Sequence, residues 1–575
     1  MSLLPPRSVV PGDRGRRPAA GAPEPIGRRA GAPGAGPSPW TFAGRHERLC
    51  GLLVLAVMAC NVFLRLDTSN VNDFDEGRYG VSAFEMQQHR AFVVTTYAGE
   101  REVWALKPPL GYWLMALSMA LFGGSALAMR LPSALCSLAA VGVTMSWARR
   151  WFGPRQAIVS GLILATTFGY LSHHGARSGD FDACLTLILL LAAVRLPGLA
   201  GTAGGEPGAR EGLAVGGAAL AAGGSPWRVV PLALLFACGF LVKSFAIAPM
   251  ALVAAGYALW TGAWRRQRLV PCLAAAGVFG AVVGAWVLAR WRAEGSPDFF
   301  LRMLRADVLE RSSSIVDKST SSPFGYVAAL FDRFAPWPPL MLAAAVVALR
   351  AGSPWRPRRG PVPVLLLLWV AVPLIFFSAV RTQHHWYLDP IYPALAILAA
   401  GSALYLVDRS PARLRSLALV ALVALPLALC EARLVGRLLT KDRMSAEQRF
   451  LREVGPAPAG GCREIRSTFR LANAERFILE VVDGFEVVEP ARGPLPPGVV
   501  EPALPPPPAE LLARVAAPPP RPAAARAPDA ACLLVGRGGW RDASAPPADA
   551  LPPPDRLLAA GETYALYRGE GARAR

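Results

Sequence analysis

Eleven apolar windows between residues 48 and 436 limit what this chain can fold into. Each window holds roughly 15 to 24 residues, about the length with which a helix crosses a hydrocarbon core of about 30 Å. The chain is 53% hydrophobic and 17% charged, with a mean hydropathy of +0.35. We therefore expect a polytopic α-helical membrane protein with about 11 to 13 transmembrane helices. The windows lie near residues 48–66, 130–149, 156–174, 182–196, 229–243, 245–262, 268–290, 326–349, 362–380, 389–407 and 414–436.

The arginines orient these windows across the membrane. Cytoplasmic loops are enriched in Lys and Arg, and residues 1–48 hold eight arginines without an apolar core. We expect residues 1–47 to form a disordered basic arm in the cytoplasm. Alternation then places four arginine-rich loops on the same side, at 148–155, 264–268, 355–359 and 408–415. The net charge of +20 follows from this bias, and no nucleic-acid-binding motif accompanies it, so we expect no nucleic-acid partner.

Residues 437–575 follow the last window and fall on the non-cytoplasmic side. Their centre, 490–528, is rich in proline, and we expect it to be unstructured. The flanking segments 476–490, 531–540 and 563–569 alternate or run apolar like strands. This pattern predicts a small soluble α/β or β domain. It contains two cysteines, for which a disulfide and two free thiols both remain open: Cys462 and Cys532.

The first loop on the non-cytoplasmic side, residues 67–129, carries an unusual group of charges. Its motif NDFDEGRYG contains five polar candidates: Asp73, Asp75, Glu76, Arg78 and Tyr79. Further along, LKPPL places a lysine before two prolines. Five cations break the bias that keeps Lys and Arg inside: Arg78, Lys107, Arg177, Lys243 and Arg381. Ionisable groups at the ends of membrane spans mark functional sites or ion pairs, and cations gathered with carboxylates suit an anionic head group.

This loop resembles the first extracytoplasmic loop of GT-C glycosyltransferases of the protein mannosyltransferase and aminoarabinose transferase type. That family has an Asp-Glu-x-Arg-Tyr, an amphipathic helix and a Lys-Pro-Pro-Leu. The segment GARSGDFDACLTL is similar to its arginine and later aspartate, matching Arg177 and Asp182, and ACGFLVKSFAI aligns Lys243. The run FFSAVRTQHHWYLDPIYPALAIL is similar to the family's late tyrosine-proline segment. The resemblance covers about residues 50–435 and implies a GT-C domain over 48–436.

The resemblance implies an inverting transfer of a sugar from a polyprenyl-phosphate donor to an acceptor. Such a transfer needs a base for the acceptor's proton and cations for the departing phosphate. The family points to Asp75 as the base, with Glu76 and Asp182 as further catalytic carboxylates. Lys107, stiffened by the prolines, is the expected phosphate clamp. The remaining candidates for binding phosphate or the lipid carrier are Asp73, Arg78, Tyr79, Arg177, Lys243, Arg381 and His385.

Several matters stay open at this point. Leu106 replaces the acid that often precedes the loop lysine, and Ser244-Phe245 replaces a Gly-Pro, so a divalent metal is an open expectation. The acceptor is a lipid, a glycan or a protein, reached at the periplasmic face of a bacterial inner membrane among membrane lipids. Asp75 can instead cap a helix or pair with Arg78, and Lys107 can snorkel to the interface. The alternative functions are a transporter or lipid flippase for an anionic lipid-linked substrate, and an inactive scaffold.

Overall fold

A helical membrane body and a small C-terminal sheet make up the described structure. The computed structural model describes residues 44–73, 75–102, 107–172, 174–200, 225–315, 322–351, 362–440, 443–454, 462–490, 531–536, 556–560 and 563–568. The predicted arm, apart from residues 44–47, and the predicted proline-rich insert, apart from residue 490, lie outside these residues.

All eleven apolar windows contain helix, which satisfies the backbone polar groups within each segment as a bilayer requires. The main helices of these windows are α1 (Gly44–Phe63), α4 (Ala126–Phe152), α5 (Pro154–Thr166), α7 (Asp182–Ala193), α9 (Val229–Lys243), α10 (Ala248–Thr261), α11 (Leu269–Glu294), α14 (Gly325–Arg333), α15 (Trp337–Arg350), α16 (Val362–Ser378), α17 (Tyr392–Arg409), α18 (Arg415–Leu419) and α19 (Leu425–Thr440). A π-helical stretch, η8 (Val420–Ala424), joins α18 to α19.

Seven described stretches are long and apolar enough to cross a membrane by length and composition. Three shorter apolar helices accompany them: α3 (Leu110–Phe122), α15 and α16. The predicted number of eleven to thirteen transmembrane helices is higher than seven for two reasons. It includes such short helices, and it counts separately the helices that lie within one long stretch. The seven stretches are His46–Phe63, Ala126–Phe152, Asp182–Leu199, Pro226–Thr261, Leu269–Glu294, His385–Arg409 and Ala412–Thr440.

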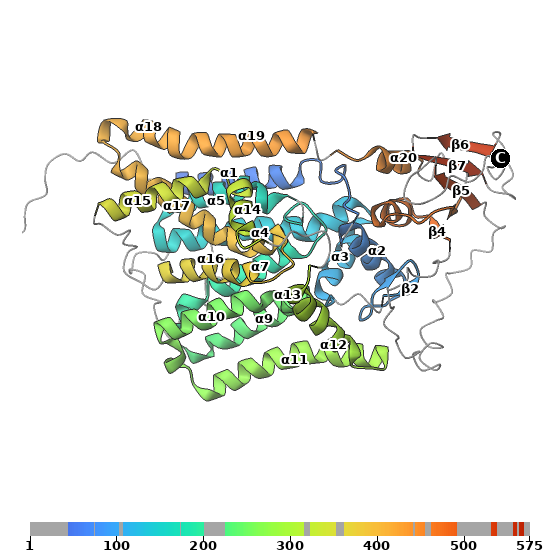
Figure 1. Cartoon of the computed structure of the whole chain (residues 1–575), viewed down its shortest axis with the longest axis horizontal. Coiled ribbons are helices and arrows are strands. Elements are labelled where there is room, and N and C mark those ends of the chain that lie inside the picture. Colours follow the sequence, from blue (N-terminus) through green and yellow to red (C-terminus); the bar gives the residue numbers. More distant parts are fainter. Residues whose placement is uncertain are drawn as a thin grey trace, which may run out of the picture.

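The stretch Pro226–Thr261 folds back on itself at Ser244, the first residue of the turn η3 (Ser244–Ile247). Ser244 has a φ of +47°, and a Cβ built on Gly239 would lie 2.9 Å from the side chain of Ile247. Residues eight apart in a straight helix are separated by about 12 Å, so the helix breaks here. Figure 1 shows α9 and α10 side by side. The break places Lys243 at the end of α9, beside the turn.

Short elements gather at one end of the helical body, where Figure 1 shows α2 and α3 beside the C-terminal sheet. The first loop folds into α2 (Asp75–Gln88), a hairpin of β1 (Thr96–Tyr97) and β2 (Glu100–Arg101), and α3. Leu117 and Leu121 on α3 are exposed, as expected of an apolar helix that meets the membrane interface. Further short elements are α6 (Phe168–Leu171), α8 (Leu196–Leu199), η2 (Pro226–Arg228), η4 (Ala263–Arg266), α12 (Asp298–Leu304), η5 (Arg305–Glu310), α13 (Arg311–Ser313), η6 (His385–Ile391), η7 (Ala412–Leu414) and α20 (Ala446–Val454).

The C-terminal residues form a five-stranded sheet in the order β4-β3-β5-β7-β6. Strand β3 pairs in parallel with β4 and β5, whereas β7 pairs antiparallel with β5 and β6, so the domain is of the α/β type. Cys462 and Cys532 form a disulfide. Its elements are β3 (Glu464–Ser467), α21 (Asn473–Arg476), η9 (Phe477–Val482), β4 (Glu486–Val488), β5 (Ala531–Gly536), β6 (Leu557–Ala560) and β7 (Tyr564–Arg568).

One strand prediction in this domain was wrong in part. Residues 476–482, expected to be extended, are helical, and only 486–488 of that segment form a strand. Phe477, Ile478 and Leu479 are all buried. A strand with one solvent-exposed face buries only every second side chain, so three consecutive buried residues do not fit such a strand. Packing of η9 between α2 and the sheet therefore overrides the β-propensity of the segment.

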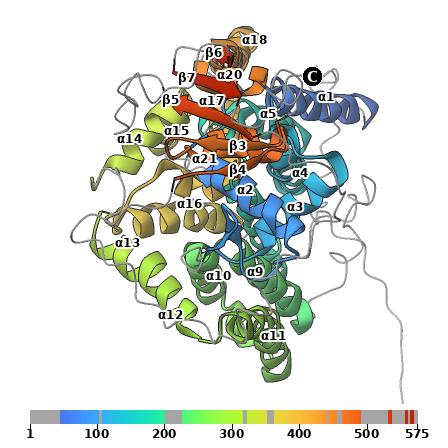
Figure 2. The same ribbon diagram turned by 90° about the vertical axis from the view of Figure 1, so that its right-hand side faces the viewer.

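The C-terminal domain packs directly on the first loop, as the end-on view in Figure 2 shows. Two glycines of the EGRYG motif allow this contact. A Cβ on Gly77 would lie 2.7 Å from the backbone nitrogen of Ala474, and one on Gly80 would lie 2.6 Å from the ring of Phe477. Both distances are too short for any side chain. The motif glycines thus serve the docking of α2 on α21 and η9.

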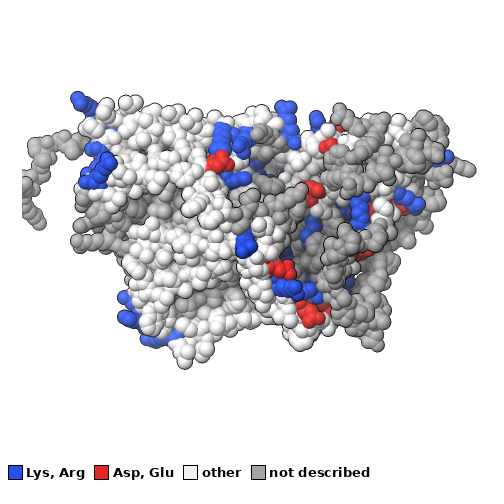
Figure 3. All heavy atoms as spheres, viewed as in Figure 1, with Lys and Arg blue, Asp and Glu red and all other residues white. Residues whose placement is uncertain are grey.

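The charged side chains on one face of the molecule leave an apolar band. In Figure 3 a broad white band covers the helical body, with Lys and Arg along its left edge, where Figure 1 shows the start of α11 and the end of α15. On this face acidic side chains appear together with basic ones from the middle of the body toward the half that carries the C-terminal sheet. Such a band is the surface expected of a protein that contacts lipid.

Candidate active site

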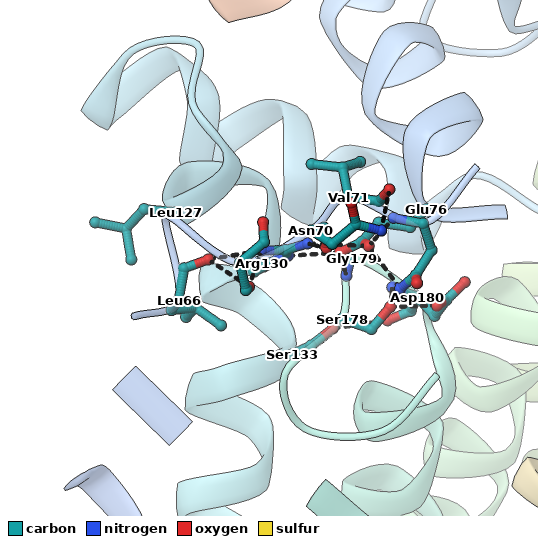
Figure 4. A network of polar contacts seen from close by, with 12 residues as sticks. Leu66, Asn70, Val71, Glu76, Leu127, Arg130, Ser133, Ser178, Gly179 and Asp180 are labelled. Carbon is teal, nitrogen blue, oxygen red and sulfur yellow. Dashed lines mark hydrogen bonds and ion pairs between the residues drawn. The ribbon is translucent and has the colours of Figure 1, made fainter. Parts of the chain in front are cut away.

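Glu76 and Arg130 form a buried ion pair that holds the first loop in place. The exposed fractions of the two residues are 0% and 1%. Arg130 Nε donates to Glu76 Oε1 at 2.6 Å, and its other nitrogens donate to Leu66 O and Asn70 O. Figure 4 shows this network. It ties the start of α2 to α4 and to the end of α1.

The Glu76 carboxylate has further donors. The backbone nitrogens of Asn72 and Gly179 donate to it, each at 2.8 Å. With these bonds and the guanidinium of Arg130, the carboxylate is fully occupied, and Glu76 does not line the cavity described below. Glu76 therefore holds its neighbour Asp75 and the 174–181 loop in place. The sequence had predicted a catalytic carboxylate at this position.

Asp75, the first residue of α2, lines a cavity of about 1520 Å³. Within the described residues its carboxylate makes no hydrogen bond or ion pair. Asp73 lies two residues earlier and faces the C-terminal domain instead: its Oδ1 accepts from the nitrogen of Ala474, and its carbonyl accepts from Asn473 Nδ2 at 2.6 Å. Of the two aspartates in the DxD, only Asp75 has a carboxylate open to the cavity.

Three of the predicted cations line the same cavity, each beside an acid. Lys243 Nζ lies 2.5 Å from Asp182 Oδ2, and Lys107 Nζ lies 3.1 Å from Asp307 Oδ1. Arg78 Nε lies 2.8 Å from Glu102 Oε1. The acid partners hold the cationic heads in fixed positions at the cavity wall, where the remaining N–H groups of each head can donate to an anion.

Asp307 was missed as a site residue. It is held by Lys107 and Ser244, and Arg311, one helical turn later, lies 3.8 Å from it. Burial opposes ionisation of this carboxyl, but the charge of Lys107 prevails and lowers its pKa. The signal in the sequence was an acid and an arginine spaced i, i+4 in the 291–325 loop, on the side where cations are unexpected.

Besides Asp73 and Glu76, four predicted residues lie away from the cavity. Tyr79 is buried, with its ring stacked on Phe181 at 4.6 Å between centroids. Arg177 is buried, and its guanidinium donates to Asn61 O, Val62 O and Leu64 O at the end of α1, which satisfies helix carbonyls.

The other two, Arg381 and His385, belong to the late loop. Arg381 is exposed, and neither residue is among those that line the cavity. Their neighbours take that place: His384, Trp386 and Tyr387 line the wall. The ring of Trp386 stacks between His384, at 4.3 Å, and His174, at 3.8 Å. The sequence therefore indicated the right segment of the late loop.

Asp75, His174 and Asp180 can hold a divalent cation. One ligand atom from each lies within 4.8 Å of the others, and His174 Nδ1 is 3.0 Å from Asp180 Oδ2. Asp180 is 1% exposed, and its Oδ1 has no hydrogen-bond partner among the described residues. Two carboxylates and an imidazole fit a transition metal such as manganese or zinc. None of these three residues is at the position of Leu106, where the family often has an acid.

The other half of the cavity is apolar. It is walled by the start of α7, the start of α10 and the end of α16, with these side chains: Leu185, Leu189, Pro249, Met250, Pro373, Phe376, Phe377 and Val380. The C-terminal domain closes the polar end with Arg470, Leu471, Asn473 and Glu489. The cavity thus has a charged end beside the first loop and an apolar side between membrane helices, which suits an amphipathic molecule.

Comparisons with known proteins agree with this architecture. The family model of dolichyl-phosphate-mannose-protein mannosyltransferases matches residues 106–197. An undecaprenyl phosphate-alpha-4-amino-4-deoxy-L-arabinose arabinosyl transferase of Pseudomonas fluorescens is 30% identical over 406 residues, covering 67% of this chain and 65% of the relative. The crystal structure of ArnT from Cupriavidus metallidurans bound to undecaprenyl phosphate superposes with a TM-score of 0.58 at 18% identity, covering 92% of this chain and 98% of that one. The chain is thus similar to GT-C proteins of the protein mannosyltransferase and aminoarabinose transferase type, and it shares their fold.

The structural match confirms the predicted fold, a multi-pass helical GT-C membrane protein with a small C-terminal sheet. The corresponding arabinosyl transferase of Pseudomonas aeruginosa is 28% identical over 359 residues, covering 61% of this chain and 59% of the relative. The chain therefore spans 59% to 65% of the length of these two relatives. Within this GT-C chain, the first-loop motif and the late loop that carried the resemblance both reach the cavity wall.

Proposed function

We propose that this protein transfers a sugar from a polyprenyl-phosphate carrier to a lipid acceptor at the non-cytoplasmic face of a bacterial inner membrane. One observation carries the proposal: a carboxylate without a partner, Asp75, shares a cavity with Arg78, Lys107 and Lys243. The apolar side of that cavity suits a prenyl chain, and the charged end suits its phosphate. The relatives act on, or bind, undecaprenyl phosphate compounds according to their names.

The chemistry assigns a separate task to each group. Asp75 takes the proton of the acceptor hydroxyl as the new glycosidic bond forms. Lys107 and Arg78 bind the phosphate and stabilise the charge that it gains as it departs. Asp182 is neutralised by Lys243 at 2.5 Å, so it positions that lysine and is a weaker candidate for the base. A divalent ion at Asp75, His174 and Asp180 would add positive charge at the same place.

The alternative of a transporter or flippase is less well supported. The lining residues come from helix ends on one side, namely the start of α7, the end of α9, the start of α10 and the end of α16, together with the C-terminal domain. A transport path needs polar residues at the midplane. The orientation follows from the arginine-rich loops, which place the arm in the cytoplasm and the C-terminal domain in the periplasm.

The test is transfer from a radiolabelled polyprenyl-phosphate sugar to lipid in membranes that contain Asp75→Asn. We expect the rate to fall by about 100-fold to 10,000-fold, because the base is lost. The matched control is Asp73→Asn, two residues away and outside the cavity, which should retain transfer when both variants are present at equal amounts. Equal rates for wild type and Asp75→Asn would refute the assignment. Labelled glycan or protein in place of lipid would refute the acceptor class.

A further inference from the structure

Three arginines surround one aromatic ring on the flank of the helical body, away from the cavity. The guanidinium carbons of Arg333, Arg433 and Arg437 lie 5.8, 5.3 and 4.1 Å from the centroid of Phe168. The four residues come from α14, α19 and α6, and none of them lines the cavity. Figure 3 shows basic side chains gathered beside an acidic one over α14 and α19.

The cluster has too few acids to balance its charge. Arg433 pairs with Asp332 at 2.9 Å, and Asp332 is 63% exposed. Arg333 donates to the neutral hydroxyl of Ser172 at 3.2 Å, and Arg437 has only its contact with the ring of Phe168 among the described residues. Among the described residues only Arg433 of the three has an ion pair, so no carboxylate is bound to Arg333 or Arg437. Like charges gathered around one ring repel one another unless an anion lies between them.

One acid and two arginines nearby do not change this balance. Glu431, on the same helix, accepts from Asn61 Nδ2 at 2.8 Å and so faces α1. Arg65 and Arg443 both donate to Leu439 O at the end of α19, where cations complement the helix dipole. Arg433 donates to Asp332 O in the last turn of α14 at 2.9 Å, and Arg437 lies in the last turn of α19. A helix terminus offers only a partial negative charge, so these positions do not neutralise the guanidiniums.

The position of the cluster along the helix identifies the partner. Residues 416–430 carry no charge, and Leu425 and Leu429 are exposed on α19. At 1.5 Å per residue, Arg433 and Arg437 lie about 27 and about 33 Å from Arg415, which ends the arginine-rich loop 408–415. The hydrocarbon core is about 30 Å thick. The two arginines therefore straddle its outer boundary, where phosphate groups of lipids lie.

We propose that Arg333, Arg433 and Arg437 bind the phosphate of an anionic phospholipid in the leaflet on the side of the C-terminal domain. The arginines stand against the bias that keeps cations inside, and an anionic head group provides the missing charge. Bidentate guanidinium–phosphate bonds suit such a group, while the exposed leucines of α19 contact its acyl chains. The inference is independent of the reaction in the cavity.

The experiment uses the full chain in phosphatidylcholine nanodiscs with a minor fraction of a photoactivatable lipid, either phosphatidylglycerol or phosphatidylcholine. Crosslinked peptides are identified by mass spectrometry. We expect residues 425–440 to crosslink several-fold more to the anionic probe than to the zwitterionic one. Arg433→Gln with Arg437→Gln should remove that preference, since each charge contributes roughly fivefold to binding near the surface. The matched control, Arg443→Gln, should retain it because Arg443 caps the helix.

Crosslinks near Arg413 and Arg415, at the other end of the same helix, should not change in any variant and report correct folding. If the double variant fails to fold, Arg437→Gln alone replaces it, because Arg437 has no ion pair to lose. Equal crosslinking of the two probes in the wild type would overturn the proposal. So would an unchanged preference in the folded double variant, or loss of the lipid in millimolar inorganic phosphate, which would indicate a site for free phosphate.

Discussion

The ion pair between Glu76 and Arg130 offers a direct test of whether Glu76 is structural. We consider Arg130→Met, Glu76→Met and the double variant. Arg130→Met leaves the Glu76 carboxylate in a fully buried site with only amide donors. Removing one partner of a buried ion pair costs about 3–5 kcal/mol. Glu76→Met leaves Arg130 equally unpaired, and it also orphans the backbone nitrogens of Asn72 and Gly179, at about 1–3 kcal/mol each.

The double variant removes both charges and keeps the cost of the two orphaned nitrogens, about 2–6 kcal/mol. It also loses the bonds of Arg130 to Leu66 O and Asn70 O, a cost that Arg130→Met shares and that therefore cancels in the cycle. The cycle should therefore show a coupling of about 3 kcal/mol or more between the two sites. Thermal unfolding of the purified full chain measures it, with each single variant losing several degrees. The control Arg155→Met removes an exposed pair with Asp408 and should change stability by less than about 1 kcal/mol.

Two results would refute this reasoning. One is wild-type stability of Arg130→Met, and the other is a cycle in which the single effects simply add. The same variants examine the catalytic role that the sequence suggested for Glu76. We expect the folded double variant to retain transfer that still depends on Asp75, because Glu76 does not reach the cavity. A folded double variant as inactive as Asp75→Asn would make Glu76 catalytic.

Three further predictions concern the phosphate, the domain contact and the metal. Lys107→Met should slow transfer by about 100-fold or more, whereas Arg381→Gln, exposed outside the cavity, should not; initial rates with labelled donor decide. Burial and, after it, the negative charge of Glu480 raise the pKa of Glu85 to about 7. Between about pH 4.5 and 7 the folded protein therefore keeps a proton on Glu85 that the unfolded chain has released, and the free energy of unfolding should fall by up to about 3 kcal/mol across this range. Thermal unfolding measures this pH dependence, and Glu85→Gln should flatten it. Manganese binding, followed by its paramagnetic signal, should be lost in Asp180→Asn, and equal binding by that variant would contradict the ligand set.

Much of the site follows from local sequence. The motif DEGRYG with a following KPPL was sufficient to indicate Asp75, Arg78 and Lys107, and all three line one cavity. Windows of the right length, and the arginines between them, were sufficient for the membrane fold, because bilayer thickness and the cost of unpaired backbone groups act on each segment separately. These constraints do not depend on which helix packs against which.

The partners of each polar group were decided only by tertiary structure. Glu76 and Asp75 are adjacent in sequence, yet one is saturated by Arg130 and amides while the other is open to the cavity. Arg177 matched a family motif but serves the end of α1. The fold of α9 at Ser244 brings Lys243 to Asp182, 61 residues earlier. Charge type and local pattern are properties of a segment, whereas burial and pairing depend on contacts between segments far apart in the chain, so the sequence alone determined the candidates and only packing chose among them.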